Sequence, residues 1–306
     1  MALPKDQYEQ LQEFFDISDF ANSGGFITDL DGTAIHEYRG VYSIPQTIEI
    51  GLKRIYDLGR PVVLNTLRFP LSVMRTFGKD WYNISNSPIP TVLMNGSQLG
   101  FIESTETGEF GYAEIEAFPL KTEEINQVME KINHLIGDGV MDLLVFYYPR
   151  NWKDGEIIWT PVKEKIQLVQ RKYLSASTVY SGEPALLSDQ LHKQDICMIF
   201  LLIEIPQDKL MAYQHTRKSN FFTQAGVDKK FGAEQIAGKL SFDLIHSVGA
   251  GDSEMDTFLN IVGQPIHVGN PGLSFKGLLP PIKLTGSQEL GDLLLALANM
   301  QRTVIK

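Results

Sequence analysis

The stretch Phe26-Ile-Thr-Asp-Leu-Asp-Gly-Thr33 (FITDLDGT, residues 26–33) decides the fold of this chain. It begins as an apolar strand and ends on Asp29 and Asp31, two carboxylates separated by one residue and followed by a glycine. Carboxylates that lie so close repel each other and are costly to remove from water. We therefore expect a cation between them, or chemistry that uses the pair.

A second acidic pair follows another apolar strand, in the stretch VGAGDSEMD at residues 248–256. Asp252 and Asp256 are four residues apart, and this spacing predicts both carboxylates on one face of a starting helix. In an open parallel sheet, ligands bind beyond the carboxyl ends of the strands. Four carboxylates at that edge predict a hard cation, and carboxylates, water and a substrate phosphate are the oxygen ligands that Mg²⁺ takes.

A phosphate bound at this edge also needs donors on the side away from the metal. A third strand ends on Asn65-Thr66, where a hydroxyl and backbone N–H groups could hold a phosphate oxygen. Lys229, just before the helical stretch FGAEQIAGKL, is the natural source of the positive charge, and Lys230 is its rival.

The bulk composition limits the classes of partner. The chain has 306 residues, 43% of them hydrophobic, and a formal net charge of -10, which argues against general binding to nucleic acid or anionic membranes. No apolar stretch approaches the roughly 20 residues of a membrane span. The single cysteine, Cys197, is expected to be a small buried hydrophobe, and a chain without disulfides fits the cytoplasm. The sequence leaves a homo-oligomer open.

Strand and helix patterns alternate at both ends of the chain, which predicts an α/β fold with a doubly wound parallel sheet. Before residue 100, apolar strand patterns alternate with helix-like spacing, and the predicted elements are 5–20, 24–33, 44–59, 60–68, 70–81 and 90–100. The alternation returns later, at 227–240, 245–263, 265–270 and 287–302.

Between these two parts the pattern changes. Residues 99–118 predict a hairpin, 121–137 a helix, and 141–149, 155–162 and 194–206 strands. Strands with a helix between them favour a separate antiparallel α+β unit. The predicted organisation is a core of residues 1–99 and 216–306 with an α+β cap, residues 100–215, inserted into it.

Taken in order, the motifs resemble those of the haloacid dehalogenase (HAD) superfamily: Asp29-x-Asp31-Gly32-Thr33, Thr66, Lys229 and Gly251-Asp252-x-x-x-Asp256. The long stretch between Thr66 and Lys229 resembles the subgroup with a large C2-type cap, which includes Cof-like sugar phosphatases, sucrose-phosphate phosphatase and mannosyl-3-phosphoglycerate phosphatase. LMNGSQLG (93–100) resembles the strand that leads into that cap, and HVGNPG (267–272) resembles the last loop. The resemblance covers the core on both sides of the insert and implies a Rossmann-like HAD core.

The resemblance implies a Mg²⁺-dependent phosphomonoester hydrolase that acts on a sugar phosphate or a similar small phosphorylated metabolite. Asp29 would be the nucleophile that becomes an aspartyl-phosphate. Asp31 would protonate the leaving alcohol and later deprotonate the attacking water. Asp29, Asp252 and the backbone carbonyl of Asp31 would bind the metal, and Asp256 would orient the ligands or hold Lys229.

The remaining positions would bind the phosphate. The resemblance assigns this to Thr66, Arg68, Lys229 and Asn270, with Thr66 and Lys229 neutralising charge in a loose transition state. Three positions depart from the family's pattern: Leu67 and Lys230 stand where it has glycine, and Met255 stands where it has asparagine. These departures bear on efficiency and subfamily more than on the type of reaction.

Simpler interpretations stand beside these roles. Asp-Gly is a common turn, Asp256 could be an exposed helical acid, Thr66 could cap a helix, and Asn270 could form a turn. Two other functions use the same core: a non-catalytic module that binds a phosphorylated ligand, and a phosphotransferase or mutase. Two catalytic aspartates argue against the first, and the long insert argues against the second.

Overall fold

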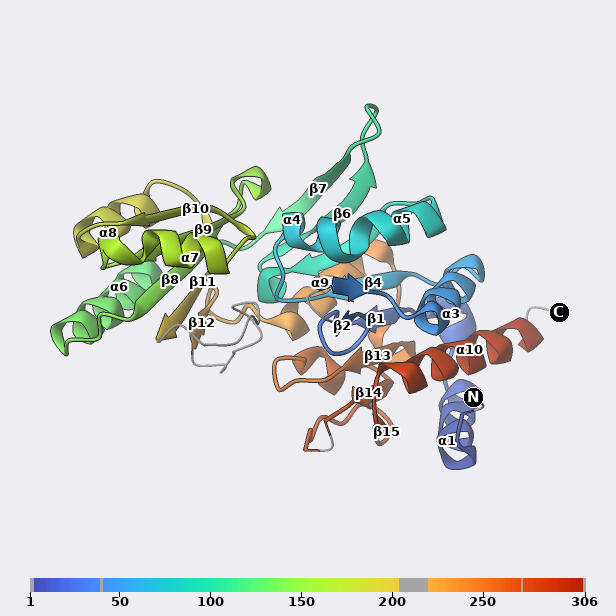
Figure 1. Ribbon diagram of the computed structural model, residues 1–306. Coiled ribbons are helices and arrows are strands. Elements are labelled where there is room, and N and C mark those ends of the chain that lie inside the picture. Colours follow the sequence, from blue (N-terminus) through green and yellow to red (C-terminus); the bar gives the residue numbers. More distant parts are fainter. Residues whose placement is uncertain (1–2, 39–40, 204–219, 271, 305–306) are drawn as a thin grey trace.

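A computed structural model describes residues 3–38, 41–203, 220–270 and 272–304 (Figure 1). In this part of the chain an eight-stranded sheet has the order β15-β14-β13-β1-β4-β5-β6-β7. Its strands are β1 (Phe26–Thr28), β4 (Val62–Asn65), β5 (Ile89–Leu93), β6 (Gln98–Ser104), β7 (Phe110–Ala117), β13 (Val248–Gly251), β14 (Gln264–Val268) and β15 (Ile282–Leu284).

The six strands from β15 to β5 run parallel, which confirms the predicted parallel sheet. The register aligns Thr28 of β1 with Ala250 of β13 on one side and with Leu64 of β4 on the other. The carboxyl ends of these three strands therefore lie side by side at one edge. The residues that follow them are the predicted site residues.

Helices cover both faces of this sheet (Figure 1). One face packs on α1 (Lys5–Ile17), α3 (Gln46–Asp57) and α10 (Ser287–Val304), and the other on α9 (Lys229–Leu240) and the short 3₁₀ helix Thr257–Asn260. Side chains alternate along a strand, so Phe26 belongs to the first core and Ile27 to the second. The sheet is doubly wound, as predicted.

Shorter elements follow the first strands. A hairpin of β2 (His36–Tyr38) and β3 (Val41–Ser43) comes directly after the FITDLDGT stretch, and the sequence did not predict it. The predicted helix 70–81 is formed by α4 (Pro70–Val73), a π-helical turn at Met74–Gly78, and α5 (Lys79–Ser85). The helix α2 (Phe20–Ser23) leads from α1 into β1.

A second sheet, of five strands, has the order β10-β9-β8-β11-β12. Its strands are β8 (Leu143–Pro149), β9 (Glu156–Thr160), β10 (Ala176–Ser181), β11 (Ile196–Ile203) and β12 (Phe221–Phe222), and its helices are α6 (Thr122–Gly137), α7 (Ile166–Lys172) and α8 (Pro184–His192). The prediction of a purely antiparallel unit is wrong, because β9 and β10 pair in parallel. That geometry is possible because α7 provides the crossover between them.

The predicted hairpin at 99–118 is present, but it extends the larger sheet. β6 pairs with β5, and β7 pairs with β6, all antiparallel. Both strands of the hairpin therefore belong to the eight-stranded sheet, and the strands of the second sheet all follow it in the sequence. The limits of the insert at residues 100 and 215 remain a prediction, and residue 215 lies outside the described residues.

Two further expectations concern single features. Cys197 in β11 is fully buried, and burial raises the pKa of its thiol to about 12, so it behaves as a small core residue.

Among the described helices, none combines the length and the apolar character needed to cross a bilayer.

Candidate active site

Asp29 is the first residue beyond β1 and lies at the centre of the edge where the parallel strands end. Its backbone N–H donates to the Ala250 carbonyl oxygen at 3.0 Å, which continues the strand ladder up to the site. Only 5% of Asp29 is exposed. A carboxylate this deeply buried needs a compensating charge.

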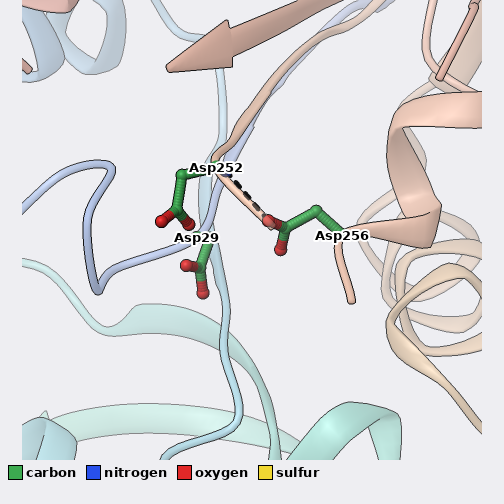
Figure 2. A group of neighbouring side chains, drawn as sticks. All are labelled: Asp29, Asp252 and Asp256. Carbon is green, nitrogen blue, oxygen red and sulfur yellow. Dashed lines mark hydrogen bonds between the residues drawn. The ribbon is translucent and has the colours of Figure 1, made fainter. Parts of the chain in front are cut away.

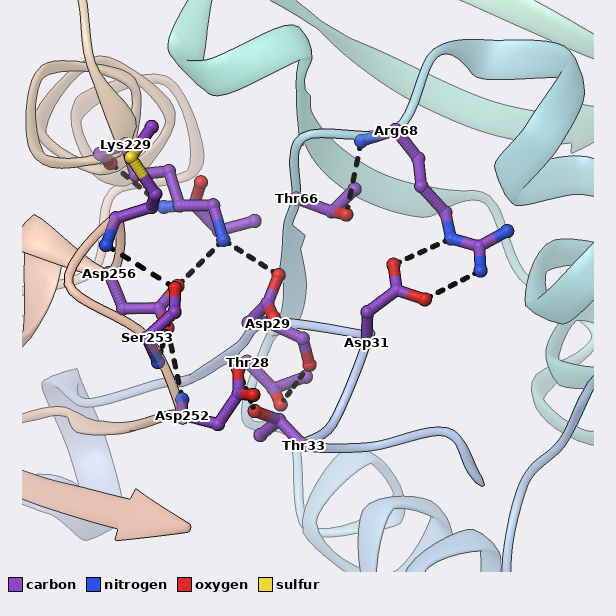
Figure 3. A network of polar contacts seen from close by, with 12 residues as sticks. Thr28, Asp29, Asp31, Thr33, Thr66, Arg68, Lys229, Asp252, Ser253 and Asp256 are labelled. Carbon is purple, nitrogen blue, oxygen red and sulfur yellow. Dashed lines mark hydrogen bonds and ion pairs between the residues drawn. The ribbon is translucent and has the colours of Figure 1, made fainter. Parts of the chain in front are cut away.

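Lys229 supplies that charge. It is the first residue of α9, and Asp228 caps the start of this helix, because the Asp228 side chain accepts a hydrogen bond from the Phe231 N–H. Its Nζ donates to Asp29 Oδ1 at 2.7 Å and to Asp256 Oδ1 at 2.6 Å, as Figure 3 shows. Lys230, the rival from the sequence, is exposed on the helix surface. Of the two lysines, Lys229 is the one at the site.

Asp256 holds the loop after β13 in shape. Its Oδ2 accepts from the backbone N–H groups of Asp252 and Ser253, at 3.0 and 2.9 Å, and from the Ser253 hydroxyl at 3.1 Å. The prediction that Asp252 and Asp256 share one face of a starting helix is wrong, because residues 252–256 form a turn. The physical reason is local: the short Asp256 side chain accepts from neighbouring backbone N–H groups, and this hydrogen bonding favours a turn over a helix.

Asp252 completes the acidic group. Asp29, Asp252 and Asp256 each offer a carboxylate oxygen, and these three oxygens lie within 4.8 Å of one another (Figure 2). Gly32 allows the Asp252 carboxylate to lie against the loop after β1, because a Cβ at this position would be 2.2 Å from Asp252 Oδ2. The φ of Gly32 is +75°, a backbone conformation that glycine adopts readily. The Thr33 hydroxyl donates to Asp252 Oδ1 at 3.3 Å.

The electrostatics of this group are unbalanced. Burial raises the pKa of Asp29 well above its ordinary value; the Lys229 charge opposes this, and the charges of Asp256 and Asp252 add to it. Burial and the Asp256 charge raise the pKa of Asp252 to about 7. Burial alone would lower the pKa of Lys229, but Asp256 and Asp29 raise it. One lysine does not neutralise three carboxylates, so the group has negative charge to spare.

The residues present fit a hard divalent cation. Both oxygens of Asp256 are engaged by protein donors. Within the described part of the chain, Asp29 Oδ2 and Asp252 Oδ2 have no hydrogen-bond donor, and Figure 2 shows these two carboxylates side by side. Free carboxylate oxygens with surplus negative charge are the donor set that Mg²⁺ or Ca²⁺ prefers.

Asp31 points away from this group. Figure 3 shows its carboxylate turned toward Arg68 on the far side of Asp29 from Lys229. Arg68 Nε donates to Asp31 Oδ2 at 2.7 Å, and Arg68 Nη2 donates to Asp31 Oδ1 at 2.6 Å. The sequence placed Arg68 on the phosphate, whereas the structure places its guanidinium on Asp31.

Thr66 and Asn270 contact backbone groups beside the site. The buried Thr66 hydroxyl oxygen accepts from the Arg68 backbone N–H at 3.2 Å, which leaves its own hydrogen free to donate. Asn270 is exposed, and its Nδ2 donates to the Asp252 backbone carbonyl at 3.1 Å. Asn270 therefore braces the loop that carries Asp252.

Some supporting residues were not predicted from the sequence. Asn65 Nδ2 donates to the Lys229 backbone carbonyl at 2.8 Å and ties β4 to the start of α9. Ser72 and Thr76 accept from Arg68 Nη1 at 3.0 and 3.2 Å. A sequence signal existed for this last pair, since positions 72 and 76 lie four residues apart within the predicted helix 70–81, which is the spacing of one helix face.

Comparison with solved structures relates this fold to known ones. A phosphatase of the HAD superfamily from Bacteroides thetaiotaomicron is 14% identical, with a TM-score of 0.63 over 92% of this chain and 96% of that one. A HAD subclass IIB sugar phosphatase is also 14% identical, with a TM-score of 0.63 over 93% of this chain and all of that one. A haloacid dehalogenase-like hydrolase from Bacteroides thetaiotaomicron is 17% identical, with a TM-score of 0.57 over 92% of this chain and all of that one.

At this level of identity the likeness establishes the fold, which is the one shared by these HAD phosphatases and was expected from the motifs. No protein-family model matches the chain, and no curated protein resembles it in sequence.

Proposed function

We propose that this chain is a Mg²⁺-dependent phosphomonoester hydrolase that works through an aspartyl-phosphate. One observation carries the proposal: the buried Asp29 carboxylate contacts Lys229 and lies close to the carboxylates of Asp252 and Asp256 at the edge of the sheet. The names of the structural neighbours, which include phosphatases of the HAD superfamily, support the same reaction.

The reaction has two halves. In the first, an Asp29 oxygen attacks phosphorus, the bond from phosphorus to the alcohol oxygen breaks, and a proton from Asp31 goes to the departing alcohol. In the second, water gives a proton back to Asp31 as its oxygen attacks the same phosphorus. The bond to Asp29 breaks, inorganic phosphate leaves, and both aspartates return to their starting states.

Asp29, Asp252 and the Asp31 backbone carbonyl are the proposed metal ligands, with Asp256 holding Lys229 and the ligand loop. When bound, Mg²⁺ would offset the charge of the carboxylates and of the phosphate oxygens. The surplus negative charge of the aspartate group supports this choice. Asp29 reacts in its ionised form, which the positive charge of Lys229 favours.

Thr66 and Lys229 are the proposed donors to the phosphate. The Thr66 hydroxyl hydrogen is free, because its oxygen already accepts from the Arg68 N–H. Lys229 is already between Asp29 and Asp256, so a phosphate that arrives at Asp29 meets a charged amine held in position. Phosphoryl transfer needs mainly this kind of positioning and charge balance.

The proposed substrate is a sugar phosphate or another small phosphorylated metabolite, in agreement with the sugar phosphatase among the structural neighbours. The unit at residues 100–215 would act as a cap that excludes water and selects the leaving group. We keep the cytoplasm as the proposed location, because the single cysteine is buried and free.

Hydrolysis of para-nitrophenyl phosphate with and without Mg²⁺ tests the proposal. We expect metal-dependent release in the wild-type protein, loss of at least about 1,000-fold in Asp29→Asn, and no loss in the exposed control Asp80→Asn. Binding of phosphorylated metabolites without any turnover would favour the binding module. Transfer of phosphate to an added sugar faster than to water would favour the phosphotransferase.

A further inference from the structure

Arg68 is the second cation at the site, and the carboxylate that it contacts is Asp31. Its Nε and Nη2 donate to the two oxygens of Asp31, at 2.7 and 2.6 Å, in the parallel two-bond geometry of an arginine–carboxylate pair. The Arg68 side chain is fully buried, whereas the Asp31 side chain is 19% exposed. The pair therefore presents its carboxylate, and not its guanidinium, toward solvent.

Further contacts hold the Arg68 guanidinium in place. Nη1 donates to the Ser72 and Thr76 hydroxyls, at 3.0 and 3.2 Å, and the Tyr42 ring lies 4.6 Å from the guanidinium carbon. The Arg68 carbonyl oxygen accepts from the Met94 N–H at 3.1 Å. Moving this guanidinium onto a phosphate would break several of these contacts together.

The two cations of the site serve different carboxylates. Lys229 contacts Asp29 and Asp256, and Arg68 contacts Asp31, on opposite sides of the Asp29 carboxylate (Figure 3). A phosphate held at Asp29 would meet Lys229 first. Arg68 would reach it only through the position that Asp31 occupies.

We infer that Arg68 is a positioning residue for Asp31 and not a phosphate ligand, so that the release of an alcohol, which needs a proton, depends on Arg68 more than the release of a weakly basic phenolate does. This inference rests on the proposed hydrolase. An alkoxide is too basic to leave unprotonated, so an acid held in a fixed orientation matters for phosphate esters of alcohols. An aryl ester such as para-nitrophenyl phosphate releases a weakly basic phenolate and needs no acid.

Arg68 also balances the charge of the proton transfer. When the Asp31 proton passes to the departing oxygen, a carboxylate forms beside the guanidinium, which stabilises it through two charge-assisted hydrogen bonds. In the second half the same carboxylate accepts a proton from water. Both halves use Asp31, but only the first depends on the basicity of the leaving group.

Arg68→Lys tests the inference, because lysine keeps the charge and loses the two-bond geometry. We compare kcat/KM, which reports the first half-reaction, for para-nitrophenyl phosphate and for glycerol 1-phosphate. We expect a loss of about 100-fold for the alkyl ester and of less than about threefold for the aryl ester. With the aryl ester kcat should fall, because the second half still needs Asp31, and a burst of para-nitrophenol should precede slow turnover.

Asp31→Asn should show the same pattern more strongly, and adding Arg68→Lys to it should cause no further loss, since the two residues act as a unit. Equal losses of kcat/KM for both esters, or independent losses in the double variant, would identify Arg68 as a phosphate ligand and overturn the inference. Unchanged kcat/KM for both esters would overturn it too.

If Arg68→Lys fails to fold, the double variant Ser72→Ala/Thr76→Val keeps both charges and removes the two hydroxyl anchors. We expect the same selective loss for the alkyl ester, of about threefold to tenfold; no selectivity would contradict the inference. A wild-type protein that hydrolyses neither ester would remove the proposed function itself, and this inference with it.

Discussion

Asp29 and Asp31 leave the same strand end two residues apart and enter opposite environments. Asp29 is buried in a group of three carboxylates, two of which pair with Lys229, and burial raises its pKa. Asp31 pairs with Arg68 through both carboxylate oxygens, and part of the Asp31 side chain is exposed. The residue type is the same, and the neighbours differ.

The difference explains how one motif could supply two kinds of chemistry. A carboxylate in a group with surplus negative charge is suited to a metal ion and to an electrophilic phosphorus. A carboxylate held by one guanidinium is suited to carrying a proton in a defined direction. When two titratable groups lie in contrasting environments, one can act as the acid or base and the other as the nucleophile.

The largest expected loss of stability comes from removing Lys229, the cation of the Asp29 group. Lys229→Met leaves Asp29 and Asp256 buried without a counter-charge, so we expect a loss of about 3 kcal/mol in the free energy of unfolding. Turnover of para-nitrophenyl phosphate should fall by at least about 100-fold. Urea unfolding and initial rates measure the two effects.

The matched control is Lys230→Met on the exposed side of the same helix turn. It should change the free energy of unfolding by less than about 0.5 kcal/mol. Equal effects of the two substitutions would mean that the Asp29 group does not depend on its lysine.

Substitution of Asp252 and of Asp256 should change the free energy of unfolding in opposite directions. In EDTA at pH 8, Asp256→Asn should lower the free energy of unfolding by about 2–3 kcal/mol, because it removes the ion pair with Lys229 and a charged acceptor of two backbone N–H groups. Asp252→Asn should raise it, because it removes a carboxylate whose charge is disfavoured at that position. Urea unfolding measures both, and a change of the same sign in both variants would contradict the assigned roles.

The pH dependence should follow Asp252. Its folded pKa is about 7, above the ordinary value, so its contribution to metal-free stability is fully present below about pH 4 and is lost as the pH rises to about 7. A cation competes with that proton, so Mg²⁺ affinity should increase up to about pH 7 and then level off. Thermal unfolding with and without Mg²⁺ from pH 5 to 9 measures this. Asp252→Asn should weaken the dependence, and the part that is left should come from Asp29, whose pKa burial also raises.

The smallest expected effect lies on the Arg68 side. Thr76→Val removes one of two hydroxyl acceptors from Arg68 Nη1, so we expect a loss of about 1 kcal/mol in the free energy of unfolding. Turnover of para-nitrophenyl phosphate should change by less than about threefold, because Ser72 still holds the guanidinium. A loss as large as that of Lys229→Met would show that the two sides are equally sensitive.

Much of the fold could be predicted because it depends on local patterns. Apolar runs that end on polar residues identified β1, β4 and β13, and their alternation with helices identified the parallel sheet. The parallel pairing of β9 with β10 was missed, because no strand was predicted from the sequence at Ala176–Ser181. The turn at 252–256 was missed because Asp256 satisfies the backbone instead of extending a helix.

The site could be predicted in its membership but not in its pairings. Asp29, Lys229, Asp252 and Asp256 were expected together, and contacts or short oxygen separations join them. Arg68 was expected on a phosphate, and it lies on Asp31. The sequence identifies which groups can ionise, but not the direction in which a side chain turns once its neighbours are in place.

By itself, the sequence determined that strands would end on carboxylates at one edge, because hydrophobic period and residue type are properties of short segments. Only the tertiary structure decided which cation each carboxylate meets, since Lys229 reaches Asp29 across 200 positions of the chain and Arg68 reaches Asp31 across 37. Charges separated along the chain interact only through space, with a strength set by distance and burial.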